Sequence, residues 1–242
     1  MSRITTKGLL LRIFIPTTIT TLAYLVLGHF IKIPHLLLFC ISATVILMPM
    51  EIAMILSASK KEYGTYSLQS AFNGQEKLAV WKTVLIASVF FGIAGLLSTF
   101  VAPLEGQLME PARNALLEAL PKGFDWSDYE YLKATFSTPM LIFTCVYYLI
   151  FNVFVGPITE ELFFRGYLTS HYKHQNSFTP ILIAVLFSLY HFWLPFANIF
   201  RILVFAPATY VAYKKKNIYI IIIFHCLCNL ISTIFAMIEI LG

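Results

Sequence analysis

The chain has 242 residues, of which 59% are apolar or aromatic and only 12% are charged, with a net charge of +5. A soluble domain carries about 25% charged residues, so this chain has too little polar surface to form one. The positive excess is spread over short polar segments, which argues against nucleic-acid binding and for a role in membrane orientation. The composition therefore predicts an integral membrane protein in contact with the lipid bilayer, with residues 1–242 forming a single transmembrane domain.

Apolar runs between charged residues predict the membrane segments, since one span needs about 20 such residues. Seven long segments result: 13–30, 36–57, 83–102, 139–167, 178–194, 196–213 and 218–241. The fourth is too long for one straight crossing and contains Gly156 and Pro157, at which it divides in an eight-helix interpretation. We therefore expect an all-α polytopic membrane protein with seven to eight transmembrane helices.

The long connection 103–138 is predicted to be an extracytoplasmic loop, and its stretch 107–120 has the periodicity of a short interfacial helix. Orientation follows from the Lys and Arg residues, which cytoplasmic segments carry in excess. With the N-terminus in the cytoplasm, the cytoplasmic positive residues are Arg3, Lys7, Arg12, Lys60, Lys61, Lys77, Lys82, Lys173, Lys214, Lys215 and Lys216. The outer ones are Lys32, Arg113, Lys122 and Lys133. This asymmetry predicts a cytoplasmic N-terminus.

Ionisable residues within spans are candidates for function, because such a residue costs several kcal/mol unless it is paired or faces a cavity. Glu161 and Arg165 are separated by one helical turn in the favourable acid-first order, so we expect them to form a structural pair. Glu160 lies about 100° away around the helix and is left free to act. Glu51 and Arg201 lie near span ends, where we expect their long side chains to reach the interface or, for Glu51, to reach Lys60.

Counting along the helices places the other polar candidates at similar depth. Glu160 and His191 lie almost equally far from Gln175, at the centre of the turn between their spans, so their heights differ by roughly 1.5 Å. His225 lies nine residues beyond Lys216, or roughly 13 Å into the membrane. Asn229 is one helical turn further along the same face. The sequence therefore predicts that a carboxylate, two imidazoles and a carboxamide converge.

These groups suit amide hydrolysis. A carboxylate and an imidazole beside one water can remove its proton, and a second imidazole with a carboxamide can donate hydrogen bonds to the developing oxyanion. The zinc pattern His-Glu-x-x-His is absent, and the only aspartates, Asp125 and Asp128, lie in the outer loop, which excludes an intramembrane aspartyl pair. No Gly-x-Ser-x-Gly motif occurs, so a serine mechanism has only Ser188, close to His191, as its candidate.

Zinc held by Glu160, His191 and His225 is a chemically reasonable alternative, since two His and one Glu plus water form a known catalytic set. The residues themselves do not choose between metal-bound and directly activated water.

Three motifs carry a family resemblance: Glu160-Glu161-x-x-x-Arg165, Phe187-x-x-x-His191 and His225-x-x-x-Asn229, in this order on the late spans. In this respect the chain resembles the CAAX-protease and bacteriocin-processing (CPBP, or Abi) family of intramembrane endopeptidases, which includes the type II CAAX prenyl endopeptidases. The resemblance covers residues 157–229, the expected catalytic core, and implies an eight-helix membrane fold. It also implies that Glu160 and His191 activate water and that His225 and Asn229 stabilise the oxyanion. Early descriptions of the family call it metal-dependent, whereas this glutamate mechanism needs no metal, and we favour the glutamate mechanism.

The resemblance does not fix the substrate. Some members cleave prenylated C-terminal tails, others process peptides to their mature form, and others serve in bacteriocin immunity and membrane-protein scaffolding. Our leading expectation is an endopeptidase acting on a peptide or membrane-protein substrate in a prokaryotic plasma membrane, with no cofactor and no nucleic-acid partner; the oligomeric state is left open. The main alternative is a non-enzymatic immunity or scaffold protein that keeps the fold. A proton-coupled carrier would also use intramembrane Glu and His, although the chain has no repeated halves.

Overall fold

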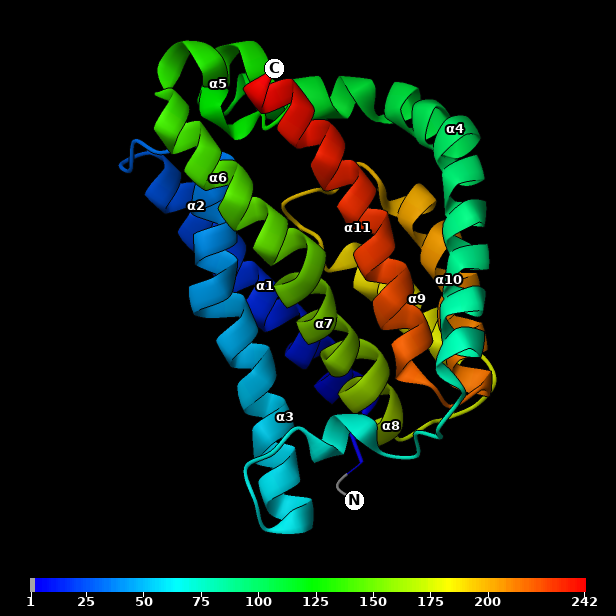
Figure 1. The fold of residues 1–242 in the computed structure, drawn as a ribbon. Helices are drawn as coiled ribbons and strands as arrows, with labels where there is room; N and C mark the ends of the chain where they lie inside the picture. The colour runs from blue at the N-terminus through cyan, green and yellow to red at the C-terminus, as the bar shows by residue number, and fades with distance from the viewer. Residues whose placement is uncertain (1–2) are drawn as a thin grey trace.

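A computed structural model describes residues 3–242. The chain is 80% helical, and the described residues form no strand, which confirms the predicted all-α class. Five helical runs are long and apolar enough to cross a membrane: α1 (Thr6–Gly28), His35–Tyr63, α4 (Val80–Glu118), Thr138–His171 and α11 (Ile218–Leu241). Together they form a bundle with the two chain ends at its opposite ends (Figure 1).

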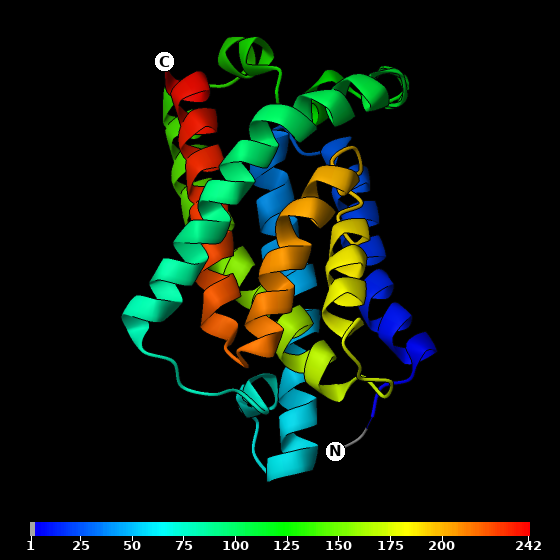
Figure 2. The same cartoon turned by 90° about the vertical axis from the view of Figure 1, so that its right-hand side faces the viewer.

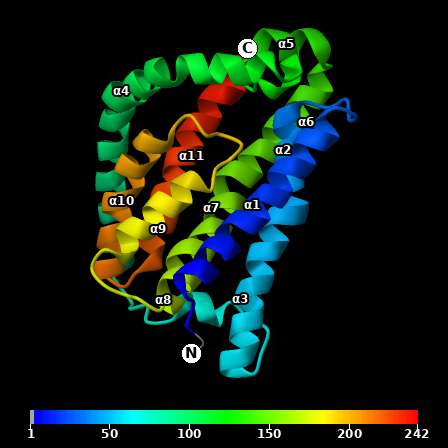
Figure 3. The same cartoon turned by 180° about the vertical axis from the view of Figure 1, so that it is seen from behind.

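The predicted count of seven to eight spans is not confirmed, because the remaining two predicted segments form shorter helices within the described chain. They are α9 (Thr179–Leu189) and α10 (Asn198–Lys214), which pack against each other. The 11 residues of α9 extend over about 17 Å. After α9 the chain turns back between Tyr190 and Ala197, a stretch that contains Pro195, and continues as α10. Figure 3 shows both helices from behind, with α9 between α1 and α10.

Two of the long runs consist of α-helices joined by π-helical turns, which are frequent at functional sites. The first run comprises α2 (His35–Ser42), a π turn (Ala43–Leu47) and α3 (Met48–Tyr63). The second comprises α6 (Thr138–Ile150), a π turn (Phe151–Val155), α7 (Gly156–Glu161), a π turn (Leu162–Leu168) and α8 (Thr169–His171). The chain therefore remains helical through Gly156 and Pro157, where the eight-helix interpretation divides it, because a π turn precedes Pro157.

Helix α4 does not end at Pro103, where the predicted outer loop begins. Figures 1 and 2 show that it rises along the bundle, bends, and continues across the end that holds the C-terminus. Pro103 and Pro111 remove two backbone N–H donors, and such positions are where helices kink. The helix expected over 107–120 therefore forms as the second part of α4. A short 3-10 turn (Lys122–Phe124) and α5 (Tyr129–Thr135) complete the connection.

The basic segments lie at the end of the bundle that holds the N-terminus, where α3 and α8 end, α4 begins and α10 joins α11 (Figure 1). A short 3-10 turn, Gln69–Phe72, packs there against the Leu162–Leu168 π turn. Gly166 permits this close approach, because a Cβ at that position would lie 2.5 Å from the backbone oxygen of Ala71. The charge separation agrees with the positive-inside rule, and the cytoplasmic location of the N-terminus stays a prediction.

Candidate active site

The structure brings the predicted water-activating and oxyanion-binding residues to one cavity of about 200 Å³. Its walls come from α2, α3, the run from α6 to α7, the end of α9, α10 and α11. Among the lining residues are Glu160, His191, His225 and Asn229. The depth count from the sequence therefore placed the three motifs at compatible heights, while the chemical roles of these residues stay predictions.

Glu161 forms the predicted structural pair with Arg165. Its side chain is fully buried, and Oε1 accepts a hydrogen bond from Arg165 Nη1 at 3.0 Å. The same oxygen lies 2.9 Å from Nδ1 of His225 on α11. The pairing survives although Arg165 lies in a π turn and not in an α-helix. Glu161 therefore fixes both the cation next to it and an imidazole from a distant helix.

The ring contacts of Phe187 give a physical reason for its presence in the second motif. The guanidinium carbon of Arg165 lies 4.1 Å from the centre of the Phe187 ring, in cation–π geometry. The rings of His191 and His225 approach the same ring edge-on, with centroid distances of 4.8 and 5.6 Å. Phe187 is fully buried, so it forms a rigid wall against which three polar side chains are oriented.

Hydrogen bonds define the tautomer of each site imidazole. Nδ1 of His191 lies 2.7 Å from the carbonyl oxygen of Phe187, and Nδ1 of His225 faces the Glu161 carboxylate. Both partners accept hydrogen bonds, so each Nδ1 carries the proton. Nε2 of neutral His191 therefore keeps a lone pair that can accept a proton. Nε2 of His225 lies 3.9 Å from Oε2 of Glu160, and it donates only when this imidazole is doubly protonated.

Asn229 binds the π turn before Pro157. Its Nδ2 donates to the carbonyl oxygen of Asn152 at 2.8 Å. In a π turn this oxygen would accept the N–H five residues ahead, but that residue is Pro157, which has none. The Asn152 side chain in turn donates to Thr233 at 2.9 Å. One N–H of Asn229 supports the backbone in this way, and the same amide nitrogen makes a longer contact of 3.5 Å with Oδ1 of Asn152.

The structure corrects the expectation for Glu51 and adds Tyr190 to the site. Glu51 does not reach the interface: it is fully buried, and its Oε1 accepts a hydrogen bond from the Tyr190 hydroxyl at 2.9 Å. Both residues line the cavity with Glu160. A depth count could have found Glu51, because it lies nine residues from Lys60, as His225 does from Lys216.

Arg201 also lines the cavity and does not extend to the outer interface as expected. Its Nη1 donates to the carbonyl oxygen of Ser188 at 3.1 Å, and its Nη2 donates to that of Leu194 at 3.3 Å. These carbonyl groups lie at the end of α9 and in the turn after it, which gives a cation near the cavity a fixed position. Ser188 itself is bonded to Asn198, with its Oγ 3.0 Å from the Asn198 carbonyl oxygen.

The ligand set of the zinc alternative is not preformed. Among residues 3–242, no group of three His, Cys, Asp or Glu side chains is arranged to hold a metal ion. In the proposed set, Nδ1 of His225 is directed to Glu161 and its Nε2 stays 3.9 Å from Glu160. Zinc–ligand distances are about 2.0–2.3 Å, so these side chains would have to move to bind it.

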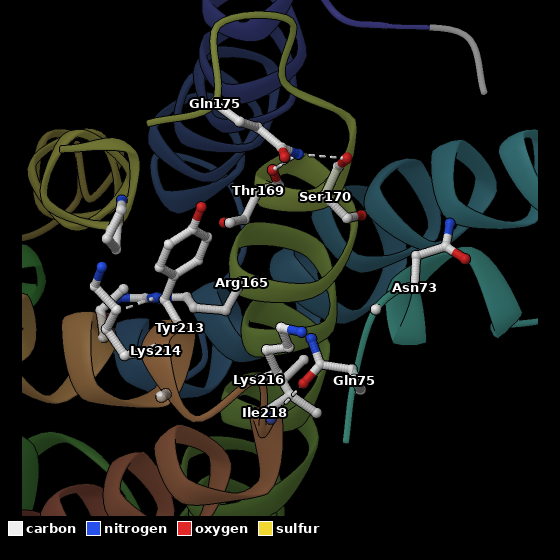
Figure 4. A pocket seen from close by; sticks show the side chains of 14 residues that line it. Asn73, Gln75, Arg165, Thr169, Ser170, Gln175, Tyr213, Lys214, Lys216 and Ile218 are labelled. Carbon is white, nitrogen blue, oxygen red and sulfur yellow. Dashed lines mark hydrogen bonds between the residues drawn. The ribbon is translucent and has the colours of Figure 1, made fainter. Parts of the chain in front are cut away.

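A second cavity, of about 430 Å³, lies at the end of the bundle that holds the N-terminus (Figure 4). Arg165, Gln175 and Lys214 are among its lining residues. Lys216, on its rim, donates a hydrogen bond to Glu76 at 2.7 Å, and this contact raises the pKa of Lys216. Arg165 therefore lines this second cavity and is also paired with Glu161 of the site.

A comparison with protein families tests the resemblance that the three motifs predict. Residues 142–231 match the family described as type II CAAX prenyl endopeptidase Rce1-like. The resemblance predicted from the three motifs is confirmed. The comparison with curated proteins and the comparison with solved structures gave no match.

The match to the Rce1-like family extends from α6 into α11 and includes every site residue predicted from the sequence. It also includes Asn152, Tyr190 and Arg201. Glu51 lies outside it, on α3. The family points to a protease that acts within the membrane and to a membrane-associated peptide or protein as substrate.

Proposed function

We propose that this protein is an intramembrane endopeptidase that hydrolyses a peptide bond of a membrane-associated substrate with water activated by Glu160 and His191. The observation that carries the proposal is the shared cavity, in which these two residues meet His225 and Asn229. The match of this part of the chain to a protease family supports it. We further propose the plasma membrane of a prokaryote as its location.

The reaction begins with a water molecule between the Glu160 carboxylate and the Nε2 lone pair of His191. Removal of its proton makes a hydroxide-like nucleophile that attacks the scissile carbonyl. The protonated base then transfers this proton to the leaving amine, so the catalyst returns to its first state. Buried donors are effective here because water does not compete for the oxyanion.

The oxyanion donors in this scheme are Nε2 of His225 and the second N–H of Asn229, which exchanges its long contact with Oδ1 of Asn152 for the oxyanion. His225 can donate from Nε2 only as an imidazolium, and the Glu161 carboxylate at Nδ1 stabilises that charged form. The arrangement parallels a catalytic triad, in which a buried carboxylate orients and supports an imidazole. Glu161 and Arg165 thus act as positioning residues.

The test is cleavage of internally quenched peptides by the purified protein in lipid vesicles. The probes are a peptide that ends in a prenylated CAAX sequence, the same peptide without its prenyl group, and peptides released from native membranes. We expect Glu160→Gln and His191→Ala each to lower turnover by roughly 100-fold or more, the range for a lost general base. Matched controls are Glu110→Gln and His174→Ala, because both native side chains are exposed.

Unchanged turnover in either site variant would contradict the water-activating pair. A chelator in the same assay tests the metal alternative, and the proposal expects cleavage to continue with no bound ion. If wild-type protein cleaves none of these probes while Glu160→Gln leaves its cellular phenotype intact, the immunity or scaffold alternative replaces the enzyme.

A further inference from the structure

Glu51 is a second carboxyl group in the cavity. Its side chain is fully buried, Oε1 accepts the hydrogen bond from Tyr190, and Oε2 has no hydrogen-bond partner. No Lys, Arg or His nitrogen among the described residues lies within 4.0 Å of either oxygen. An ionised carboxylate without a cation is strongly disfavoured in such a place.

The other buried acids nearby have charged or strongly donating partners. Glu161 is paired with Arg165 and His225. Glu105 on α4 accepts two backbone N–H groups at the start of α10, from Ile199 at 2.7 Å and Phe200 at 2.6 Å. These contacts stabilise the ionised form of both Glu161 and Glu105.

Glu160 has to be ionised to act as a base. Two guanidinium groups lie near these carboxylates, those of Arg165 and Arg201. Arg165 is already engaged by Glu161, so the remaining cation, Arg201, balances only one further carboxylate. While both site imidazoles are neutral, an ionised Glu51 would give the cavity two neighbouring carboxylates against one free cation, which like-charge repulsion disfavours.

We propose that Glu51 is a protonated carboxylic acid that faces Glu160 and keeps a second negative charge out of the active cavity. Its carbonyl oxygen is Oε1, held by the Tyr190 hydroxyl, and its proton is on Oε2. Glu51 is therefore a positioning residue, which fills its place beside Glu160 without adding a negative charge. This role rests on the proposed function, but the protonation state does not, so the two can be tested separately.

Infrared difference spectra of the protein in lipid vesicles at neutral pH test the protonation state directly. Subtracting the Glu51→Gln spectrum from that of the wild type should reveal the carbonyl stretch of one protonated carboxylic acid. Tyr190→Phe should move this band to higher frequency, because the carbonyl loses its hydrogen bond. Glu110→Gln is the matched control and should remove no such band, because Glu110 is exposed.

Loss of a carboxylate band, in place of the acid band, on Glu51→Gln would overturn the proposal. If Glu51→Gln does not fold, the comparison of Tyr190→Phe with the wild type still decides the matter, because a protonated Glu51 requires the band shift. Helix content and a single symmetric gel-filtration peak establish that each variant is folded.

The pH profile of peptide cleavage tests the role. At alkaline pH Glu51 loses its proton, and the new charge repels the oxyanion of the transition state, so the wild-type rate declines. Gln at this position cannot ionise, so the alkaline limb of Glu51→Gln should lie at higher pH. The other titratable or charged groups lining the cavity are present in both proteins: Tyr148, Glu160, Tyr190, His191, Arg201 and His225.

Superimposable alkaline limbs would overturn the electrostatic role of Glu51. Absence of any cleavage by the wild type would count against the proposed function, and the infrared result would still stand for or against the protonated carboxyl group.

Discussion

The buried pair Glu161–Arg165 predicts a strongly non-additive response to substitution. The perturbation is replacement of either side chain, or both, by Met, which is apolar and has similar length. Met at position 161 leaves the Arg165 guanidinium buried without its carboxylate, and Met at position 165 leaves the Glu161 carboxylate without its cation. The double variant leaves neither charge.

The magnitude follows from burial and geometry. The side chains of Arg165 and Glu161 are 4% and 0% exposed, and the ion pair has an N–O distance of 3.0 Å. Removing one partner of such a pair destabilises a protein by about 3–5 kcal/mol, whereas replacing both by apolar groups is often close to neutral. Two independent losses would sum to about 6–10 kcal/mol. We expect the double variant to lose no more than the worse single one, with part of that loss from the unpaired Nδ1 of His225.

The assay is reversible unfolding of each variant in mixed detergent micelles, followed by circular dichroism, with the four free energies combined in a double-mutant cycle. The exposed pair Lys216–Glu76 provides the control, because its side chains are 59% and 63% exposed. Breaking it with Glu76→Gln should leave stability nearly unchanged. A double variant whose loss equals the sum of the single losses would refute the coupling.

Two further substitutions probe how the fold positions the site. Gly166→Ala should destabilise the protein by about 1–3 kcal/mol through overpacking against Ala71, whereas Gly92→Ala, with open space around it, should not; thermal unfolding compares them, and equal midpoints would contradict the close approach. Glu105→Gln should cost about 1–3 kcal/mol, because a neutral amide replaces a carboxylate bonded to two N–H groups of α10. Hydrogen exchange at the start of α10 measures this change, and protection equal to that of Glu118→Gln, whose native side chain is exposed, would contradict it.

The parts of the site that the sequence predicted are those set by helical spacing. Glu161 and Arg165 meet because one turn brings them together, and depth counting placed His191 and His225 beside Glu160. The count led to residues of one cavity because each count began at a polar turn at the same end of the bundle. Phe187 was located by resemblance alone, and its contacts with Arg165 and both imidazoles give the physical reason for it.

The parts that the sequence did not predict depend on partners far away in the chain. Glu51 is buried and accepts its hydrogen bond from Tyr190, which is 139 residues away. Counting from the nearest basic residue gives its depth, but it does not reveal whether a partner will meet it. Pro103 and Pro157 interrupt the pattern of backbone donors, yet neither ends a helix, because neighbouring structure accommodates the missing bonds. For this reason α4 continues beyond Pro103, and the carbonyl oxygen of Asn152, which Pro157 leaves without a backbone donor, accepts a hydrogen bond from Asn229.

In the proposed mechanism, the way in which each acid is neutralised separates the supporting carboxylates from the reactive one. Glu161 has an arginine at 3.0 Å, and Glu105 has two backbone donors within 2.7 Å. Glu160 has no salt bridge shorter than the 3.9 Å separation from His225, so its negative charge is the least compensated of the three. A weakly compensated carboxylate binds a proton more readily than a paired one, and this property makes Glu160 the most suitable base of the set. The same reasoning requires Glu51 to stay uncharged, because a second uncompensated charge beside Glu160 would oppose the oxyanion that the site has to stabilise.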